Sequence, residues 1–295
     1  MTASWAWRAS KHVDSRFKMR VRFVAASLLA PAASTKLARA EISSPIGELL
    51  AEWPETAGIL LWPYQCAAWD SETRVDRMAE HLDAVRKIPG LKLQPDEKMV
   101  LADLSSFSPG TFLILDRAPW LSREGHLTLS LFKDDFRAFT LSFSLSGFPD
   151  TELFIGGLQG RHGDEILAMY RDLTKDFEGM RPRDFILEML RMFANKIGVR
   201  RIYAVADSSK IFTHKYFADK GGSGLAYDDV WTERGGQRVA STHFELPLGG
   251  HRRPIDEIPA KKRSMYRRRH AMLEQIEEML PSDLTKAERR HFNAR

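Results

Sequence analysis

The segment best suited to bind an anion is a glycine-rich stretch, Gly156-Gly157-Leu158-Gln159-Gly160-Arg161-His162-Gly163-Asp164. Glycines let main-chain N–H groups approach a ligand, and a helix starting at Asp164 would present its positive end. We therefore expect the pyrophosphate of coenzyme A or a nucleotide to bind Gln159, Gly160, Arg161, His162 and Gly163, with Arg161 as a charged fork. Because the pattern matches neither the P-loop nor the dinucleotide fingerprint, a tight turn that needs glycine is the alternative.

Histidine and carboxylates, the residue types of general acid–base catalysis, form a second group. His214 precedes Asp228 and Glu233, and we expect these three as catalytic candidates. Separate structural roles are the alternative, because neighbours in sequence need not be neighbours in space. The chain has no Gly-x-Ser-x-Gly elbow and no His-Glu-x-x-His motif, and Cys66 is its one cysteine. A cysteine cluster and an intrachain disulfide are thereby excluded, and the sequence indicates no metal site.

Basic residues are concentrated near the C-terminus. Between residues 251 and 270, eight Lys and Arg residues and two acidic residues give +6, so the rest of the chain sums to −1 against +5 overall. The anion-binding candidates are Lys261, Lys262, Arg263, Arg267, Arg268 and Arg269. Three interpretations stay open: a solvated helix face, a phosphate-bearing partner such as coenzyme A or an anionic lipid, and nucleic acid. Nucleic acid is least favoured, because basic and aromatic residues do not interleave over a sheet.

Hydrophobic periodicity indicates which elements position these groups. In the N-terminal part the clearest helix covers residues 72–87, with His81 beside its apolar stripe as a packed structural histidine. Strand patterns begin after Gly110, at residues 112–115, 126–132, 136–145 and 152–158. The short polar turns between the last three predict an antiparallel meander.

Two amphipathic helices follow, over residues 164–177 and 182–197, and then a strand over 201–206 that packs most simply into the same sheet. Beyond it we expect a short helix at 214–219, strands near Val230 and over 242–246, and a final helix from Pro259 to Leu280. The predicted fold class is α+β: a helical N-terminal part, then a mixed, largely antiparallel sheet with packed helices. Residues 1–110 and 111–295 are the expected domains.

The N-terminal segment allows two interpretations. Arg16, Lys18, Arg20 and Arg22 precede an apolar run at 23–30, as in a secretory signal. A short amphipathic helix at the start of the domain is favoured instead, because the apolar run is short and basic residues follow it soon after. No stretch approaches the roughly 20 apolar residues of a membrane span. Low cysteine usage fits a reducing compartment, so we expect a cytoplasmic protein, with peripheral attachment to the inner membrane as an extension.

The chain resembles the VirK/YbjX family of bacteria, a family of unknown function. The likeness rests on ordered blocks at Glu124–Leu131, Leu141–Ser144, Ile155–Gly160, Tyr227–Glu233 and Glu257–Arg269. It implies that residues 20–40 belong to the folded domain, which weakens the signal interpretation. It also implies association with virulence, surface-protein localisation and resistance to antimicrobial peptides. It carries over no catalytic residue.

Two functions follow from these observations. The first is an acyltransferase similar in layout to the GNAT superfamily, with acyl-coenzyme A as cosubstrate or acyl carrier protein as donor and partner; this is a fold-level analogy. The second is a noncatalytic envelope-stress factor whose basic helix binds anionic lipid or an acidic protein.

Overall fold

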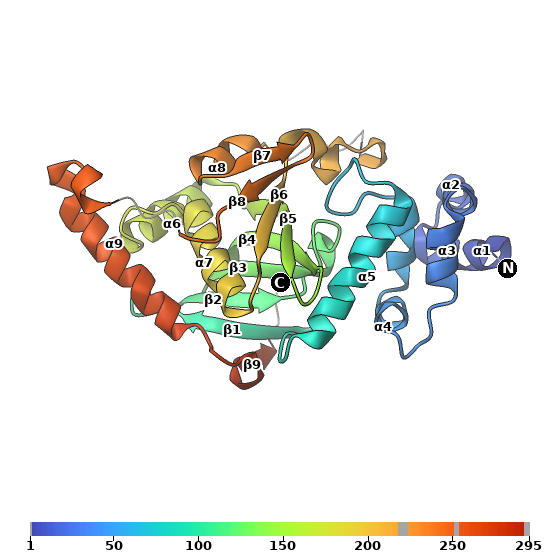
Figure 1. Cartoon of the computed structure of the whole chain (residues 1–295), viewed down its shortest axis with the longest axis horizontal. Helices are drawn as coiled ribbons and strands as arrows, with labels where there is room; N and C mark the ends of the chain where they lie inside the picture. The colour runs from blue at the N-terminus through green and yellow to red at the C-terminus, as the bar shows by residue number, and fades with distance from the viewer. Residues whose placement is uncertain (1, 218–223, 251–253, 292–295) are drawn as a thin grey trace.

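The computed structural model describes residues 2–217, 224–250 and 254–291. Helices make up the N-terminal part, as predicted: α1 (Thr2–Val13), α2 (Phe17–Leu29), α3 (Pro31–Ala38), α4 (Pro45–Glu52) and α5 (Ser71–Lys87). In Figure 1, α1 to α4 form one end of the molecule and α5 lies between them and the sheet. Asp70 begins α5 by accepting a hydrogen bond from the Thr73 N–H (2.8 Å). Val75 and Met78 then pack with the N-terminal helices, while Ala84 joins the core of the sheet, so α5 connects both parts.

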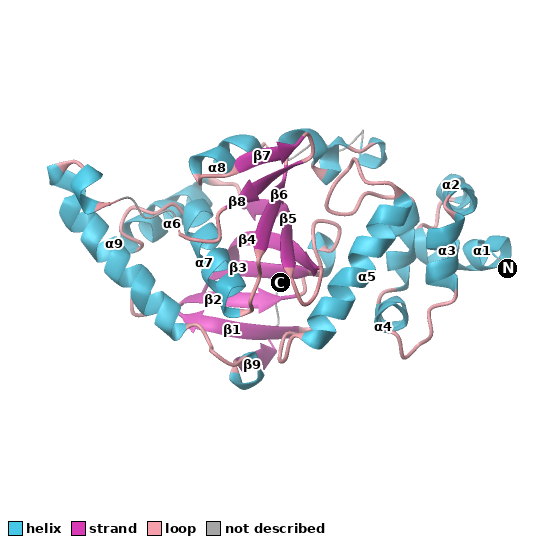
Figure 2. Cartoon of the chain, viewed as in Figure 1, coloured by secondary structure: helices cyan, strands magenta, loops and turns pink. Residues whose placement is uncertain are grey.

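A nine-stranded sheet forms the rest of the core, in the order β7-β8-β6-β5-β4-β3-β2-β1-β9. Its strands are β1 (Glu97–Asp103), β2 (Thr111–Asp116), β3 (Leu127–Lys133), β4 (Phe136–Ser146), β5 (Glu152–Gly160), β6 (Arg201–Val205), β7 (Gln237–Ala240), β8 (His243–Leu246) and β9 (Glu288–His291). Among the described strands β5 and β6 pair in parallel, and the other pairs are antiparallel. Figure 2 shows helices flanking this twisted sheet, so the α+β class is confirmed.

The two faces of the central strands differ in chemistry. Along β4, Phe139, Leu141 and Phe143 point to one side, where Phe143 meets Phe193 of α7 (Pro182–Lys196). Because successive side chains of a strand alternate, Ser142 and Ser144 point to the other side. That second face is also buried, although it carries mostly hydroxyl side chains. A polar face kept from solvent is the surface on which the candidate site is built.

Three helices complete the described fold: α6 (Asp164–Asp176), α8 (Tyr227–Glu233) and α9 (Ala260–Met279). The predicted strand near Val230 is wrong, because Val230 lies in α8 and turns its side chain into the core. β1 adds a strand to the part predicted to be helical. Residues 214–217 contain a single 3-10 turn, and 218–223 lie outside the described residues. Among the helices described, none is long and apolar enough to cross a bilayer.

Candidate functional site

The three predicted catalytic groups lie in separate surroundings. Asp228 accepts a hydrogen bond from the Asp207 N–H (2.8 Å), and Asp207 accepts in return from the Asp228 N–H (3.0 Å). This reciprocal pair fixes the start of α8. Glu233, five residues later and so on another face of the helix, forms ion pairs with Arg181 (3.0 Å) and Arg183 (2.7 Å).

His214 has other partners again. Its Nε2 lies 3.4 Å from a guanidinium nitrogen of Arg74, and its Nδ1 accepts from the Tyr216 N–H. Burial, then the charges of Arg74 and Lys215, lower the pKa of His214 to about 4. His214, Asp228 and Glu233 contact different partners and not one another, so a joint acid–base role has no geometric support and each remains a prediction.

The glycine-rich stretch ends β5 and leads into α6. The Gln159 amide donates to both carboxylate oxygens of Glu124 (2.7 Å each), and the Arg161 N–H donates to the Tyr170 hydroxyl (2.8 Å). Asp164 and Glu165 occupy the first turn of α6, where they offset the attraction of the helix end for anions. His162 and Gly163 are exposed. The pyrophosphate site at Gln159–Gly163 stays a prediction. The Gln159 amide and the Arg161 N–H, two of its expected donors, already donate to other residues of the protein.

A hydrogen-bonded cluster occupies the polar face of the sheet. The Tyr64 hydroxyl lies 2.8 Å from Nδ1 of His126 and 2.6 Å from Oγ of Ser144. Nδ1 of His81 accepts from the Leu145 N–H (3.1 Å), so a neutral His81 carries its proton on Nε2. The rings of His81 and His126 stack with centroids 5.4 Å apart. α5, the segment after η1 (Pro54–Leu60), β4 and the loop before β3 thus converge here.

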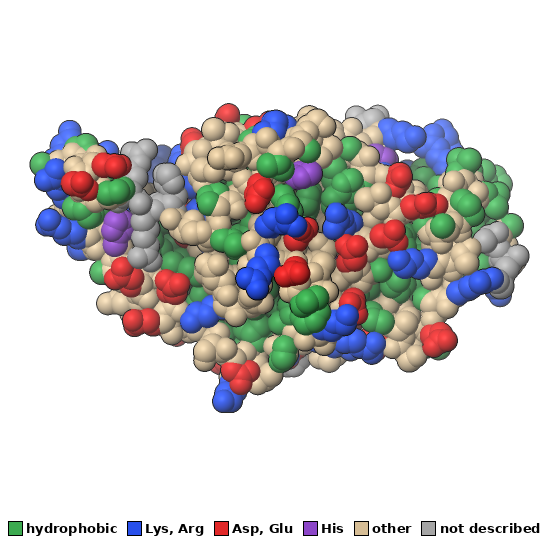
Figure 3. Space-filling model, viewed as in Figure 1, with side chains coloured by type: hydrophobic (Ala, Val, Ile, Leu, Met, Phe, Trp, Pro, Cys, Tyr) green, Lys and Arg blue, Asp and Glu red, His purple; other side chains and the backbone are tan. Residues whose placement is uncertain are grey.

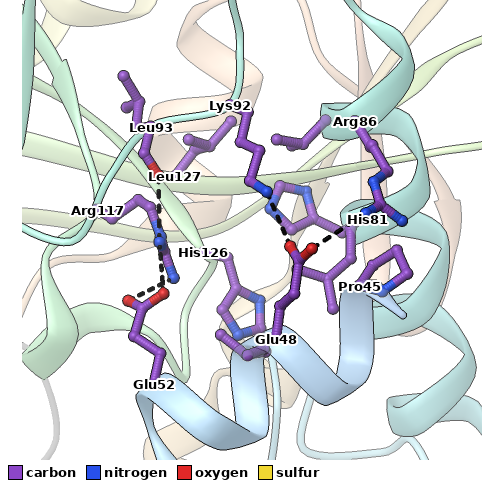
Figure 4. Close-up of a pocket in the computed structure, with 13 residues that line it drawn as sticks. Pro45, Glu48, Glu52, His81, Arg86, Lys92, Leu93, Arg117, His126 and Leu127 are labelled. Carbon is purple, nitrogen blue, oxygen red and sulfur yellow. Dashed lines mark hydrogen bonds and ion pairs between the residues drawn. The ribbon is translucent and has the colours of Figure 1, made fainter. Parts of the chain in front are cut away.

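A small cavity of about 70 Å³ opens beside the two histidines (Figure 4). Its rim carries ion pairs: Glu48 with Arg86 (3.0 Å) and Lys92 (2.8 Å), and Glu52 with Arg117 (3.0 Å). Within the residues that the structure describes, neither histidine Nε2 has a hydrogen-bond partner. The cavity therefore offers a ligand two imidazole nitrogens and a charged rim.

A larger cavity of about 250 Å³ also has His126 in its lining. Its walls combine the aromatic residues Trp53, Trp62, Tyr64, Trp120 and His126 with polar residues that include Glu55, Thr56, Ser122 and Arg123, and we call it the aromatic cavity. The Arg123 guanidinium stacks on Trp62, 4.3 Å from the ring centroid. A concave site that combines aromatic side chains with converging polar groups can hold a small molecule.

The electrostatics keep both histidines uncharged. Burial, then the charge of Arg117, lowers the pKa of His126 to about 3. Burial, then the neighbouring His126, lowers the pKa of His81 well below its usual value. Burial also raises the pKa of the Tyr64 hydroxyl. Near neutral pH this cluster consists of neutral donors and acceptors.

Glu124 is the titratable group that the sequence interpretation missed. It is 2% exposed and lies against β5: a Cβ on Gly157 would fall 2.0 Å from its carboxylate, and one on Gly156 2.1 Å from its carbonyl oxygen. Burial raises the pKa of Glu124 to about 7, although the Gln159 amide favours the ionised form. Glu124-Gly125-His126 begins the first sequence block that resembles the family. That position was the signal in the sequence that could have indicated Glu124 as a site residue.

Tyr227 fills the space where β5 and β6 separate. The two strands pair from Glu152 to Ile155 of β5, which then continues to Gly160 without β6. There the Tyr227 hydroxyl binds the N–H (2.8 Å) and the carbonyl (3.1 Å) of Leu158. These main-chain groups are therefore already paired.

The basic helix α9 uses part of its charge within the protein. Arg268 pairs with the Glu178 carboxylate (2.8 Å), Arg269 donates to the Glu178 carbonyl, and Arg263 donates to the Ile258 carbonyl. Lys261, Lys262 and Arg267 are exposed, and their side chains form no ion pair or hydrogen bond with another described residue. Residues 251–253 lie outside the described ranges. Half of the six predicted anion-binding residues thus have internal partners.

Metal binding has no candidate in this part of the chain. No group of three or more His, Cys, Asp or Glu side chains is placed to hold a metal ion in the ranges 2–217, 224–250 and 254–291. Cys66 is fully buried, and burial raises the pKa of its thiol, as befits the core residue expected.

Comparisons with known proteins agree with the family resemblance. The chain is 36% identical over 126 residues to the uncharacterized protein YbjX of Escherichia coli K12, a match covering 42% of this chain and 38% of that protein. It is 28% identical over 163 residues to an uncharacterized protein of Haemophilus influenzae, covering 52% and 51%. The chain thus matches two fifths to one half of the length of these relatives. No solved structure matches it. A family model described as "Protein of unknown function (DUF535)" matches residues 12–282, and the chain belongs to this family.

Proposed function

We propose that the protein is an acyltransferase that moves an acyl group from a thioester to a hydroxyl or amino group beside Glu124. The layout supports the reaction class: an antiparallel meander, two crossover helices and a parallel strand, similar to the GNAT superfamily. In sheets with parallel strands, ligands bind beyond the carboxyl ends of the strands. Glu124 lies at that end of β5. The likeness is one of fold alone, so the chemistry has to be argued from the site.

The observation that supports this proposal is the burial of the Glu124 carboxylate, which is 2% exposed and accepts hydrogen bonds from the Gln159 amide. A pKa of about 7 gives both forms near neutral pH, which suits a group that accepts a proton and returns it. Glu124 would take the proton of the acceptor as its oxygen or nitrogen attacks the thioester carbon. The carbon–sulfur bond then breaks, and the leaving thiolate receives that proton from Glu124.

The path of the donor follows from the contacts around Glu124. Tyr227 already satisfies Leu158, so the thioester arm does not run between β5 and β6 at that point. Ser122, Arg123 and His126 flank Glu124 in the chain and line the aromatic cavity, whereas the Glu124 side chain is buried and is not part of that lining. We place the acyl group there. Acyl-coenzyme A would use Gln159–Gly163, and the acidic surface of an acyl carrier protein would suit Lys261, Lys262 and Arg267.

The test combines binding with turnover. Melting temperature is measured with coenzyme A, acyl-coenzyme A of several chain lengths and acyl-acyl carrier protein; saturation at about 100 times Kd adds roughly 2.7 kcal/mol. Thiol release is then measured for wild type, Glu124→Gln and Glu233→Gln. We expect Glu124→Gln to lose roughly a hundredfold or more and Glu233→Gln to keep its rate. If thiol release is lost in Glu233→Gln and kept in Glu124→Gln, Glu233 is the general base, as the sequence predicted. If no thioester raises the melting temperature, the acyltransferase proposal is wrong.

A second candidate function rests on the unpaired cations of α9. Lys261, Lys262 and Arg267 are exposed residues of α9, which lies at the end of the molecule opposite α1 (Figure 1). They favour a noncatalytic role at the cell envelope, in which a cytoplasmic protein binds anionic lipid or an acidic protein and so contributes to virulence. Such binding should weaken with added salt. Charge removal at these three positions should abolish it while Arg200→Gln, an exposed arginine elsewhere, should not.

A further inference from the structure

The first two helices, α1 and α2, carry large apolar side chains that are exposed and lie outside the core. Met19, Phe23 and Ser27 of α2 face inward and pack among the N-terminal helices. On the opposite side Phe17 (70% exposed), Val21 (46%), Leu28 (54%) and Leu29 (86%) face outward. With Trp7 of α1 they are five of the twelve exposed large apolar side chains among the described residues, within about a tenth of the chain. An apolar face of this kind is typical of a contact surface.

The outward residues follow the geometry of the helix. Phe17, Val21 and Leu28 form one row, and Lys18, Arg22 and Leu29 form the row beside it, since steps of four and seven residues return to the same side. Trp7 extends the apolar row across to α1, because its ring meets that of Phe17 at 6.3 Å. Figure 3 shows green apolar and blue basic side chains next to each other at the end formed by these helices.

The charge of this surface has one sign. α1 and α2 contain no acidic residue, and their cations are Arg8, Lys11, Lys18, Arg20 and Arg22. Asp14, between the helices, is paired with Arg16 at 2.8 Å. Arg20 stacks on Trp7, 4.2 Å from the ring centroid, which holds a cation over the aromatic pair. Cations beside exposed aromatic and aliphatic residues match a surface with negative headgroups above an apolar layer.

We propose that the α1–α2 hairpin docks the protein on an anionic lipid bilayer. Phe17, Val21, Leu28 and Leu29 enter the boundary between headgroups and acyl chains, with α2 parallel to the membrane plane. Lys18 and Arg22 contact lipid phosphates beside that row. This surface is distinct from Glu124 and from α9, so it stands or fails independently of both proposed functions.

The experiment is sedimentation of the full chain with vesicles of phosphatidylcholine containing about 30% phosphatidylglycerol, and with pure phosphatidylcholine vesicles, at about 150 mM NaCl. Binding to the anionic vesicles alone is expected. Leu28→Gln/Leu29→Gln and Lys18→Gln/Arg22→Gln should each lower the partition coefficient roughly tenfold or more. Ile42→Gln, an exposed apolar residue outside the surface, and Lys196→Gln/Arg200→Gln, two exposed cations at and after the end of α7, are matched controls expected to stay within about twofold.

Three outcomes overturn the proposal. The wild-type chain could fail to sediment with anionic vesicles, or both α2 variants could bind like wild type. Light scattering could instead show a wild-type dimer that Leu28→Gln/Leu29→Gln dissociates, which would assign the surface to a second copy of the chain. All four α2 positions are exposed, and the charge variant reports separately should the leucine variant misfold. Thiol release should be equal in the wild type and in the two α2 variants, so failure here leaves the acyltransferase proposal intact.

Discussion

His81 and His126 stack face to face, with ring planes 10° apart, although one lies on α5 and the other precedes β3. Two imidazolium cations at this distance would repel each other strongly in a buried site. Burial and this contact therefore keep the pair neutral, and Tyr64 and Leu145 orient the two rings. The cluster is consequently a set of fixed neutral hydrogen-bonding groups.

The neutral pair should make stability fall in acid. The unfolded chain binds protons at both histidines below about pH 6.5, whereas folded His126 does so only near pH 3. The unfolded state then holds more protons, so the free energy of unfolding decreases as pH falls from 6.5 towards 3. His81→Gln should flatten this slope by about 1.4 kcal/mol per pH unit in urea titrations. His12→Gln, on the exposed side of α1, should retain the wild-type slope, and an unchanged slope in His81→Gln contradicts a buried neutral histidine.

Glu124 should act in the opposite direction. Its folded pKa of about 7 lies above its unfolded value, so its contribution is present below about pH 4.5 and is lost as pH rises through 7. Between pH 4.5 and pH 8, the wild type should lose on the order of 3 kcal/mol of unfolding free energy relative to Glu124→Gln. Glu55→Gln is the exposed control. A pH-independent difference would mean that the carboxyl group is ionised in the fold.

A buried ion pair on the same polar face carries a third prediction. Arg137 binds both carboxylate oxygens of Asp116, one of them at 3.1 Å, and both side chains are buried. Asp116→Asn should lower the free energy of unfolding by about 3–5 kcal/mol, because Arg137 loses its counterion. Asp116→Leu/Arg137→Met should cost less than the sum of its single changes. Asp83→Asn, which breaks an exposed pair with Lys87, should leave the urea midpoint nearly unchanged.

The meander was predictable from sequence because each of its strands buries one apolar row. Leu127, Leu129 and Leu131 alternate with polar residues, and the predicted turn lies between Lys133 and Phe136. β1 shows no such alternation, since its residues 99–102 are all apolar and a register shift separates Val100 from Ala102. α8 was mistaken for a strand because a seven-residue helix is too short to establish a 3.6-residue period.

The site was harder to predict because its groups are distant in sequence. Tyr64 and His126 are 62 residues apart, and Ser144 comes from a third segment. The raised pKa of Glu124 depends on its burial against Gly156 and Gly157, which only the folded sheet brings to it. Sequence proximity drew attention instead to Asp228 and Glu233, which the turn of α8 directs to different partners.

The cations of α9 should divide into two classes. Lys261→Gln/Lys262→Gln/Arg267→Gln should leave the melting temperature within about 1 °C, because surface charges without partners contribute little to folding. Arg269→Gln should lower it by roughly 2 °C or more, since the Arg269 side chain donates twice to the Glu178 carbonyl (3.0 and 2.7 Å). If calorimetry gives the same change in melting temperature for the triple variant and for Arg269→Gln, this division between free and structural cations is wrong.

Tyr227 offers the sharpest test of how the strands separate. Tyr227→Phe removes one hydroxyl and leaves the N–H and carbonyl of Leu158 unpaired in a buried place, which should cost roughly 2 kcal/mol. Hydrogen exchange at the Leu158 amide should accelerate in the variant. Tyr266→Phe, whose hydroxyl has no hydrogen bond to another described residue, is the matched control and should change neither quantity. If Tyr227→Phe instead speeds thiol release at unchanged stability, the donor arm uses the gap between β5 and β6, and the route through the aromatic cavity is wrong.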